Sequence, residues 1–254
     1  MIRMRVIGIA AVWLIAAGNL SVATAAVTPV TAPATVPAPA PLTAAPTGAT
    51  PSSASATQDW RLSVREFAAK HFKNPAWGYS HCQRDYALAR ALAAADQVVL
   101  DDDVLYAAAY LHDIAAFAPW EDTKVDHSDV GARVVDTILK GTGFPMAKID
   151  AVRGAIRTHM YYREPVGPEA LYLHDADALD WLGAIGVARI IALVDPNGGR
   201  PDGAKAVAML VDNLNKVPGR VLSPAGRARV PERQAELEKF LKDLRRETDD
   251  LRSL

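Results

Sequence analysis

The chain of 254 residues contains a single cysteine, Cys82. One cysteine cannot form a disulfide within the chain, and it excludes a zinc site built from several thiolates. The formal net charge is only -1 at pH 7, so the composition gives no indication of a nucleic-acid polymer as partner. A glycine-rich phosphate loop of the Walker type is also missing from the sequence, which therefore gives no sign of ATP-driven work.

The first residues carry the pattern of an export signal. A short basic start (MIRMR, residues 1–5) precedes an apolar run over residues 6–17, and small residues stand before a cut after Ala25. This pattern predicts a secretory signal peptide over residues 1–25, with a retained anchor as the alternative. The apolar run is well short of the roughly 20 residues that span a bilayer. We therefore expect an exported, periplasmic protein with no stable membrane span after cleavage, if the source is a Gram-negative bacterium.

Residues 26–58 are rich in proline, alanine and threonine and contain no charged or aromatic side chain. Such a segment cannot bury enough apolar surface to offset the conformational entropy that folding removes. We therefore predict a disordered linker over residues 26–58. The folded domain is expected over residues 59–254, which is long enough for one hydrophobic core.

From Trp60 onward, apolar residues recur at steps of three and four, and the alternation typical of strands is nearly absent. The pattern predicts a single all-α domain, a bundle of helices. Glycine and proline clusters supply the stop signals, such as Gly141-Thr142-Gly143. The expected helices span residues 63–72, 80–95, 102–111, 128–139, 147–160, 168–194, 204–216 and 232–251.

Several histidines and aspartates stand at or near the ends of these expected helices. The stretch YLHDI ends an apolar run with the pair His112-Asp113, and two aspartates lie inside a long apolar helix. Buried carboxylates are costly unless they are paired or bound to a metal. Imidazole and carboxylate together suit ions such as Mn, Fe, Ni, Zn or Mg. Because helices of a bundle can direct such side chains to one interior point, the pattern indicates a metal site.

The ordered series resembles the HD superfamily of metal-dependent phosphohydrolases. Their signature is a histidine, an adjacent His-Asp pair and a later aspartate on successive helices; here these are His81, His112-Asp113 and Asp177. The segments SHCQRDYALARAL, AVRGAIRTHMYY and HDADALDWLGAIGVAR are also similar to segments of that family. The resemblance runs from about Trp77 to the C-terminus. It implies an HD-domain helical bundle that hydrolyses a phosphoester or phosphoanhydride.

The resemblance also implies a divalent metal, which would be Mn, Fe, Ni, Co, Zn or Mg. The implied ligands of a first ion are His81, His112, Asp113 and Asp177. His127 and His159 would hold a second ion in a two-metal member of the family. In a one-metal member they would instead face the substrate phosphate or donate a proton, and the sequence leaves both versions open.

Two aspartates compete for the last ligand position. The family pattern Ala-Asp-X-(large apolar) favours Asp177, whereas helical periodicity places Asp175 in register with inward-facing leucines. The two lie about 200° apart around a helix, so they cannot share one face. We favour Asp177, with Asp175 as an acceptor that orients a ligand histidine. Asp180 is either a further acceptor of that kind or a solvent-exposed helix residue.

Three further roles follow for the expected reaction. Arg84 lies one turn after His81, where a guanidinium can hold a phosphate oxygen; an ion pair with Asp85 or Asp113 is the alternative. Asp113 would orient a metal-activated water as well as bind the metal. Either His127 or His159 would protonate the leaving group. His174 and His71 are expected to take no part.

The sequence thus predicts a metal-dependent phosphohydrolase that acts on a nucleotide or another small phosphate compound. One alternative is an HD-fold oxygenase that uses a di-iron site with the same ligands. Another is a non-enzymatic sensor of a metal or nucleotide, which the complete set of ligand positions disfavours. The export signal fits poorly with a nucleotide substrate, because the similar bacterial proteins are cytoplasmic nucleotide hydrolases. The oligomeric state is left open.

Overall fold

The structure is a computed structural model that describes residues 53–253. Within this range the chain forms α-helices and short 3-10 helices and no strand, which confirms the all-α prediction. None of the described helices combines the length and the apolar composition needed to cross a bilayer. The α-helices are α1 (Ser53–His71), α2 (Tyr79–Ala95), α3 (Asp102–Leu111), α4 (His127–Leu139), α5 (Ile149–Arg157), α6 (Pro168–Asp180), α7 (Gly183–Ile191), α8 (Gly203–Lys216) and α9 (Pro224–Glu247).

The N-terminal boundary of the domain differs from the expected one. The predicted signal peptide and most of the predicted linker lie outside the described residues. Helix α1 begins at Ser53, so the last residues assigned to the linker belong to this helix.

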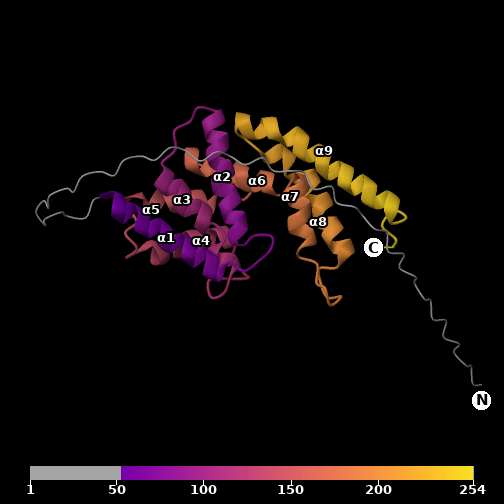
Figure 1. Ribbon diagram of the computed structural model, residues 1–254, viewed down its shortest axis with the longest axis horizontal. Coiled ribbons are helices and arrows are strands. Elements are labelled where there is room, and N and C mark those ends of the chain that lie inside the picture. The colour runs from indigo at the N-terminus through magenta and orange to yellow at the C-terminus, as the bar shows by residue number, and fades with distance from the viewer. Residues whose placement is uncertain (1–52, 254) are drawn as a thin grey trace, which may run out of the picture. The chain divides into compact units, whose positions relative to one another are not determined.

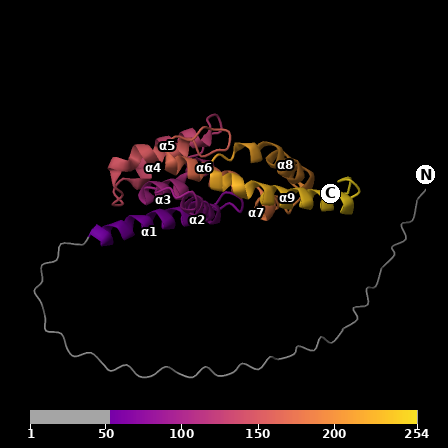
Figure 2. The same ribbon diagram turned by 90° about the horizontal axis from the view of Figure 1, so that it is seen from above.

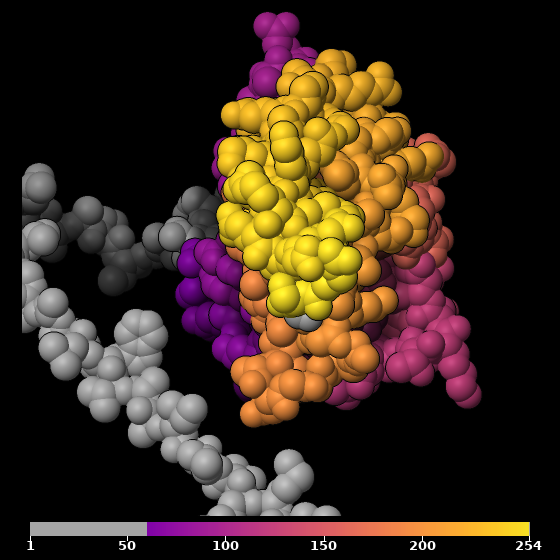
Figure 3. Space-filling model, turned by 90° about the vertical axis from the view of Figure 1, so that its right-hand side faces the viewer, coloured from indigo at the N-terminus to yellow at the C-terminus, as the bar shows by residue number. Residues whose placement is uncertain are grey.

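The helices pack as two neighbouring groups. In the first, α2 packs on α3 and α6, α5 packs on α3 and α4, and α1 lies on α3 (Figure 1). In the second, α9 lies along α7 and α8 and reaches α6 (Figure 2). Figure 3 shows α9 and α8 forming the face at the C-terminal end of the molecule. Helix α6 contacts helices of both groups, so its residues can face the core of either group.

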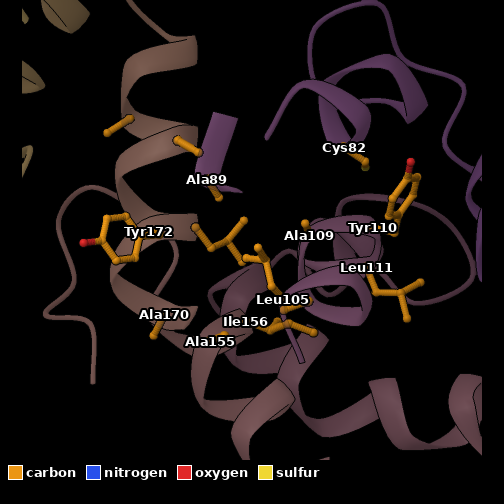
Figure 4. Packing of buried hydrophobic residues seen from close by; sticks show 14 of the residues in the cluster. Cys82, Ala89, Leu105, Ala109, Tyr110, Leu111, Ala155, Ile156, Ala170 and Tyr172 are labelled. Carbon is orange, nitrogen blue, oxygen red and sulfur yellow. The ribbon is translucent and has the colours of Figure 1, made fainter. Parts of the chain in front are cut away.

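Helix α3 forms the centre of the first group. Every residue from Val104 to Leu111 is buried, and Figure 4 shows Leu105 packed near Ile156 of α5. Its N-terminus is capped by Asp101, whose carboxylate accepts the backbone N–H of Asp103 at 3.1 Å. The cap fixes where this helix begins, and the helix ends at Leu111, directly before the His-Asp pair.

The prediction of one long helix over residues 168–194 is wrong. Helix α6 ends at Asp180, and α7 begins at Gly183 with a left-handed φ of +67°. The periodicity continues across the break because Leu182, between the two helices, is itself buried. Hydrophobic pattern alone therefore cannot reveal the turn.

Two other expected boundaries also differ. The last helix spans Pro224–Glu247 rather than residues 232–251, because Ser223 accepts the backbone N–H of Gly226 at 3.1 Å and so caps it early. The helix expected over residues 147–160 is shorter, Ile149–Arg157, and a 3-10 turn over Met146–Lys148 precedes it.

We expect Gly183→Ala to lower the free energy of unfolding by about 1–2 kcal/mol, because a side chain in this backbone conformation is strained. The added Cβ would also lie 2.6 Å from Oε2 of Glu236 and 3.2 Å from the side chain of Arg233. Gly154→Ala is the control, since nothing lies within 4 Å of its Cβ. It should raise the stability by about 0.5–1 kcal/mol. Chemical denaturation measures the stability of both variants. Wild-type stability of Gly183→Ala would contradict the left-handed backbone conformation at residue 183.

Candidate metal centre

Three fully buried histidines direct the same ring nitrogen, Nε2, into the interior of the first helix group. The Nδ1 of His81 lies 2.9 Å from Oδ2 of Asp180. The Nδ1 atoms of His112 and His159 lie 2.9 Å and 2.6 Å from the carbonyl oxygens of Ala109 and Ile156. These partners are acceptors, so in the neutral ring Nδ1 carries the proton and donates it. Each Nε2 then presents a lone pair, which is the tautomer that binds a metal.

Two carboxylates and the first two histidines converge on one point. Nε2 of His81 lies 3.2 Å from Nε2 of His112 and 3.2 Å from Oδ1 of Asp177. Oδ2 of Asp113 lies 3.3 Å from Nε2 of His112. We call His81, His112, Asp177 and this oxygen of Asp113 the first donor group.

The other oxygen of Asp113 faces a second set of donors. Oδ1 of Asp113 lies 3.3 Å from Nε2 of His127 and 3.6 Å from Nε2 of His159. The two imidazole nitrogens are 3.3 Å apart. We call His127, His159 and Oδ1 of Asp113 the second donor group. A single carboxylate therefore borders both groups, with one oxygen toward each.

These donors fit divalent cations. Metal–ligand bonds of about 2.1 Å place neighbouring ligand atoms about 3.0 Å apart in an octahedron and about 3.4 Å apart in a tetrahedron. The measured separations in the first donor group begin at 3.2 Å, so an ion would fit between the atoms. Oδ2 of Asp177 is buried and has no hydrogen-bond partner among the described residues. Lone pairs that face one another at these distances repel, and a cation between them would reverse that repulsion.

The ends of helices hold the donors in place. His81 lies in the first turn of α2, and His112 is the residue after α3. His127 opens α4, where Asp126 accepts the backbone N–H of Ser128 at 2.9 Å and caps the helix. His159 follows the end of α5. The predicted metal residues are thus brought together from five different segments of the chain, as the HD resemblance implies.

Asp180 is buried and orients a donor histidine, so the solvent-exposed alternative for this residue is wrong. Besides His81, its carboxylate binds Nη2 of Arg84 at 2.8 Å and Nη1 of Arg189 at 3.1 Å. Burial would raise the pKa of Asp180, but the hydrogen bonds from His81 and Arg84 and the charge of Arg189 lower it. Arg84 is therefore paired with Asp180 rather than with Asp85 or Asp113. Its phosphate-binding role stays a prediction.

Asp175 lies outside both donor groups. Its carboxylate accepts the backbone N–H groups of Leu222 at 2.9 Å and Ser223 at 2.6 Å, and it binds Nδ1 of His174 at 2.9 Å. It therefore attaches the segment before α9 to α6 and orients no donor histidine, so that expectation is wrong. Helix α6 is buried on all sides near its end, which is why periodicity could not separate Asp175 from Asp177.

The sequence analysis missed two buried charged residues at the site. Asp85 is fully buried one turn after His81, and its Oδ2 lies 3.1 Å from Nε2 of that histidine. Arg189 is buried with its guanidinium 3.7 Å from the centre of the Trp181 ring, and it donates to the carbonyl oxygen of Ala76. The i, i+4 spacing of His81 and Asp85 was a signal for the first residue. No local signal marks Arg189, since it acts across the boundary between α6 and α7.

The two buried aspartates nearest the histidines have opposite electrostatic surroundings. Burial raises the pKa of Asp85 well above its usual range, and the neighbouring carboxylate of Asp180 adds to this shift. Burial would also raise the pKa of Asp113, but the adjacent imidazoles, above all that of His112, lower it well below the usual range when they carry a proton. Asp113 is therefore ionised and able to bind a cation. Asp85 lacks any compensating positive partner at hydrogen-bond distance among the described residues.

A cavity of about 300 Å³ opens beside both donor groups. Asp113, Asp177 and His127 form its polar side. Its other walls are apolar or aromatic, and they are Trp77, Ala116, Met160 and Trp181. The cavity is large enough for a small-molecule group to reach the donors.

The fold and the convergent donors define an all-α domain with a buried centre of metal-binding type. Residues 78–182 match the family model described as HD domain. The fold of the chain is that of HD-superfamily hydrolases. A search of curated proteins gives no match.

Solved structures share this fold. A predicted HD superfamily hydrolase from an uncultured Thermotogales bacterium is 27% identical, with a TM-score of 0.52, and the alignment covers 75% of this chain and 91% of that one. A Lactobacillus plantarum protein is 21% identical with a TM-score of 0.58, covering 74% and 96%. Bacillus subtilis YpgQ, solved in complex with ADP, is 21% identical with a TM-score of 0.57, covering 77% and 96%.

We expect Asp180→Asn to weaken metal binding by about 10–100-fold, because the carboxylate fixes the ring orientation and tautomer of His81. The amide keeps the size of the side chain but loses the charge that pairs with Arg84 and Arg189. Isothermal titration with Mn²⁺ measures the affinity. Glu236→Gln, at a carboxylate outside both donor groups, is the control and should bind as the wild type does. Unchanged affinity in Asp180→Asn would show that His81 needs no such partner.

Proposed function

We propose that this protein is a metal-dependent phosphohydrolase with two ion sites joined by Asp113. The observation that carries this proposal is the position of that carboxylate, with one oxygen toward His112 and the other toward His127. The two donor groups would each hold one divalent ion, and a pair of ions in adjacent sites is suited to clamp a phosphoryl group. Such ions supply a water of lowered pKa and polarise the phosphoryl oxygen when they are bound.

The protein's own residues would then position the substrate and move protons. The side chain of His127 is 28% exposed and lines the cavity, whereas His159 is fully buried. We assign the protonation of the leaving group to His127 if only one ion binds, because only this imidazole can reach the substrate. Asp113 would orient the attacking water from the same wall of the cavity. Arg84 would act through Asp180, to which it is hydrogen-bonded.

The proposed substrate is a nucleotide or another small phosphate compound. The resemblance to the fold of YpgQ, which was solved with ADP, supports this class. The aromatic walls of the cavity, Trp77 and Trp181, would pack on a planar leaving group. Export to the periplasm also stays a proposal, and it favours a phosphate compound that is available outside the cytoplasm.

The central test combines metal content with turnover on the purified chain from residue 26 onward. Elemental analysis would precede assays of p-nitrophenyl phosphate and nucleotides with Mn, Fe, Ni, Co, Zn and Mg. We expect about two equivalents of metal and release of phosphate. One equivalent of metal with release of phosphate would support the hydrolase and would indicate that His127 and His159 contact the substrate. Bound iron with O₂-dependent turnover and no phosphate release would replace the proposal with the oxygenase.

We expect His112→Ala and Asp113→Ala each to lower kcat/KM for phosphate release at least about 10³-fold, because each removes a donor of the first group. The helical circular dichroism spectrum should be retained. His71→Ala is the matched control, because its ring contacts Phe67 and Trp120 rather than the donors. Wild-type turnover by either donor variant with the same metal would refute the site.

A further inference from the structure

Asp85 is a buried carboxylate that does not belong to the metal ligands implied by the HD signature. The side chain is fully buried on α2, and neither of its oxygens has a hydrogen-bond partner among the described residues. Oδ2 lies 3.1 Å from Nε2 of His81 and 3.7 Å from Nε2 of His112. A buried carboxylate without partners costs several kcal/mol of folding free energy, so its persistence in the core needs a compensating group.

Positive side chains do not supply that compensation. Arg84 is directed at Asp180, and Arg189 contacts Asp180 with Nη1 and lies with Nη2 3.4 Å from Nε2 of His81. Neither guanidinium forms a hydrogen bond with Asp85. His81 already uses Nδ1 as the donor to Asp180, so its Nε2 faces Asp85 with a lone pair. Two acceptors 3.1 Å apart require either a proton or a cation between them. The atoms around this point include a second imidazole nitrogen and Oδ1 of Asp177, 3.2 Å from the same Nε2 of His81.

We propose that Asp85 is a further ligand of the ion in the first donor group, a proposal that rests on the metal site of the proposed function. The ligand atoms of His81, Asp85, His112 and Asp177 all lie within 4.8 Å of one another. With Oδ2 of Asp113, the ion would have two imidazole and three carboxylate donors. This set leaves one position of an octahedron for water or substrate.

The donor set also predicts which ion the site prefers. Carboxylate oxygens suit harder ions such as Mn²⁺, and octahedral sites rich in oxygen are typical of them. Structural zinc sites are four-coordinate and rich in nitrogen or sulfur. The extra carboxylate therefore favours Mn²⁺ or Fe²⁺ over Zn²⁺ at the first donor group. It also offsets the charge of a divalent ion in a largely buried site.

The test is a metal titration of the purified chain rather than an activity assay. In Asp85→Asn we expect the Kd for Mn²⁺ to rise at least about 10-fold, and the Kd for Zn²⁺ to rise less. Asp175→Asn is the matched control, because it replaces another fully buried aspartate of the same core and should leave both affinities unchanged. Mn²⁺ affinity in Asp85→Asn equal to that of the wild type would overturn the proposal.

A second variant separates folding from binding. Asp85→Val fills the same space without a polar group, so the metal-free variant should melt at or above the temperature of the metal-free wild type. Its rise in melting temperature on adding Mn²⁺ should be smaller than that of the wild type. An equal rise would mean that Asp85 carries a proton and no ion. His112→Ala, a variant of another donor of the first group, is titrated in parallel. If the wild type itself binds no Mn²⁺, the proposed function fails. If the Asp85 variants bind Mn²⁺ as the wild type does, only the proposal about Asp85 fails.

Discussion

The structure depends on how the four buried aspartates around the donor histidines are compensated. Asp180 is compensated by two guanidinium groups and by the N–H of His81. Among the described residues, Asp85, Asp113 and Asp177 have no guanidinium at hydrogen-bond distance, and they face imidazole nitrogens instead. Because uncompensated charges in a core are strongly destabilising, these carboxylates would be stabilised by cations bound among the donor atoms or by protons on the imidazoles. A bound cation would couple metal binding to folding at this centre.

The ends of helices orient two of the donor histidines. The last carbonyl groups of a helix have no partner within the helix. His112 and His159 each follow a helix and donate Nδ1–H to the carbonyl oxygen three residues earlier. The helix end thus satisfies its own carbonyl and turns Nε2 toward the interior in one contact. This geometry explains why the YLHDI stretch closes an apolar helix with a histidine and an aspartate.

The sequence predicts the helical class and most of the donor residues, since both follow from local pattern and from an ordered signature. It does not predict contacts that form only when distant segments meet. Asp175 and Asp177 lie on a helix that is buried all round, so amphipathicity cannot separate them. Their partners do, because Asp175 binds the backbone before α9 while Asp177 faces His81. Arg189 pairs with Asp180 across the glycine break at residue 183, which the continuous hydrophobic pattern conceals.

The shared carboxylate of Asp113 makes the two donor groups interdependent. An ion held by one oxygen fixes the orientation of the other oxygen and so prepares the second group for its ion. The like charges of two ions oppose that effect, and the number of carboxylates nearby decides the balance. A first group with Asp85 as a donor would carry three carboxylates, more negative charge than one divalent ion neutralises. The remaining charge would favour a second cation beside His127 and His159, so under this proposal the additional buried aspartate would stabilise a two-ion site electrostatically.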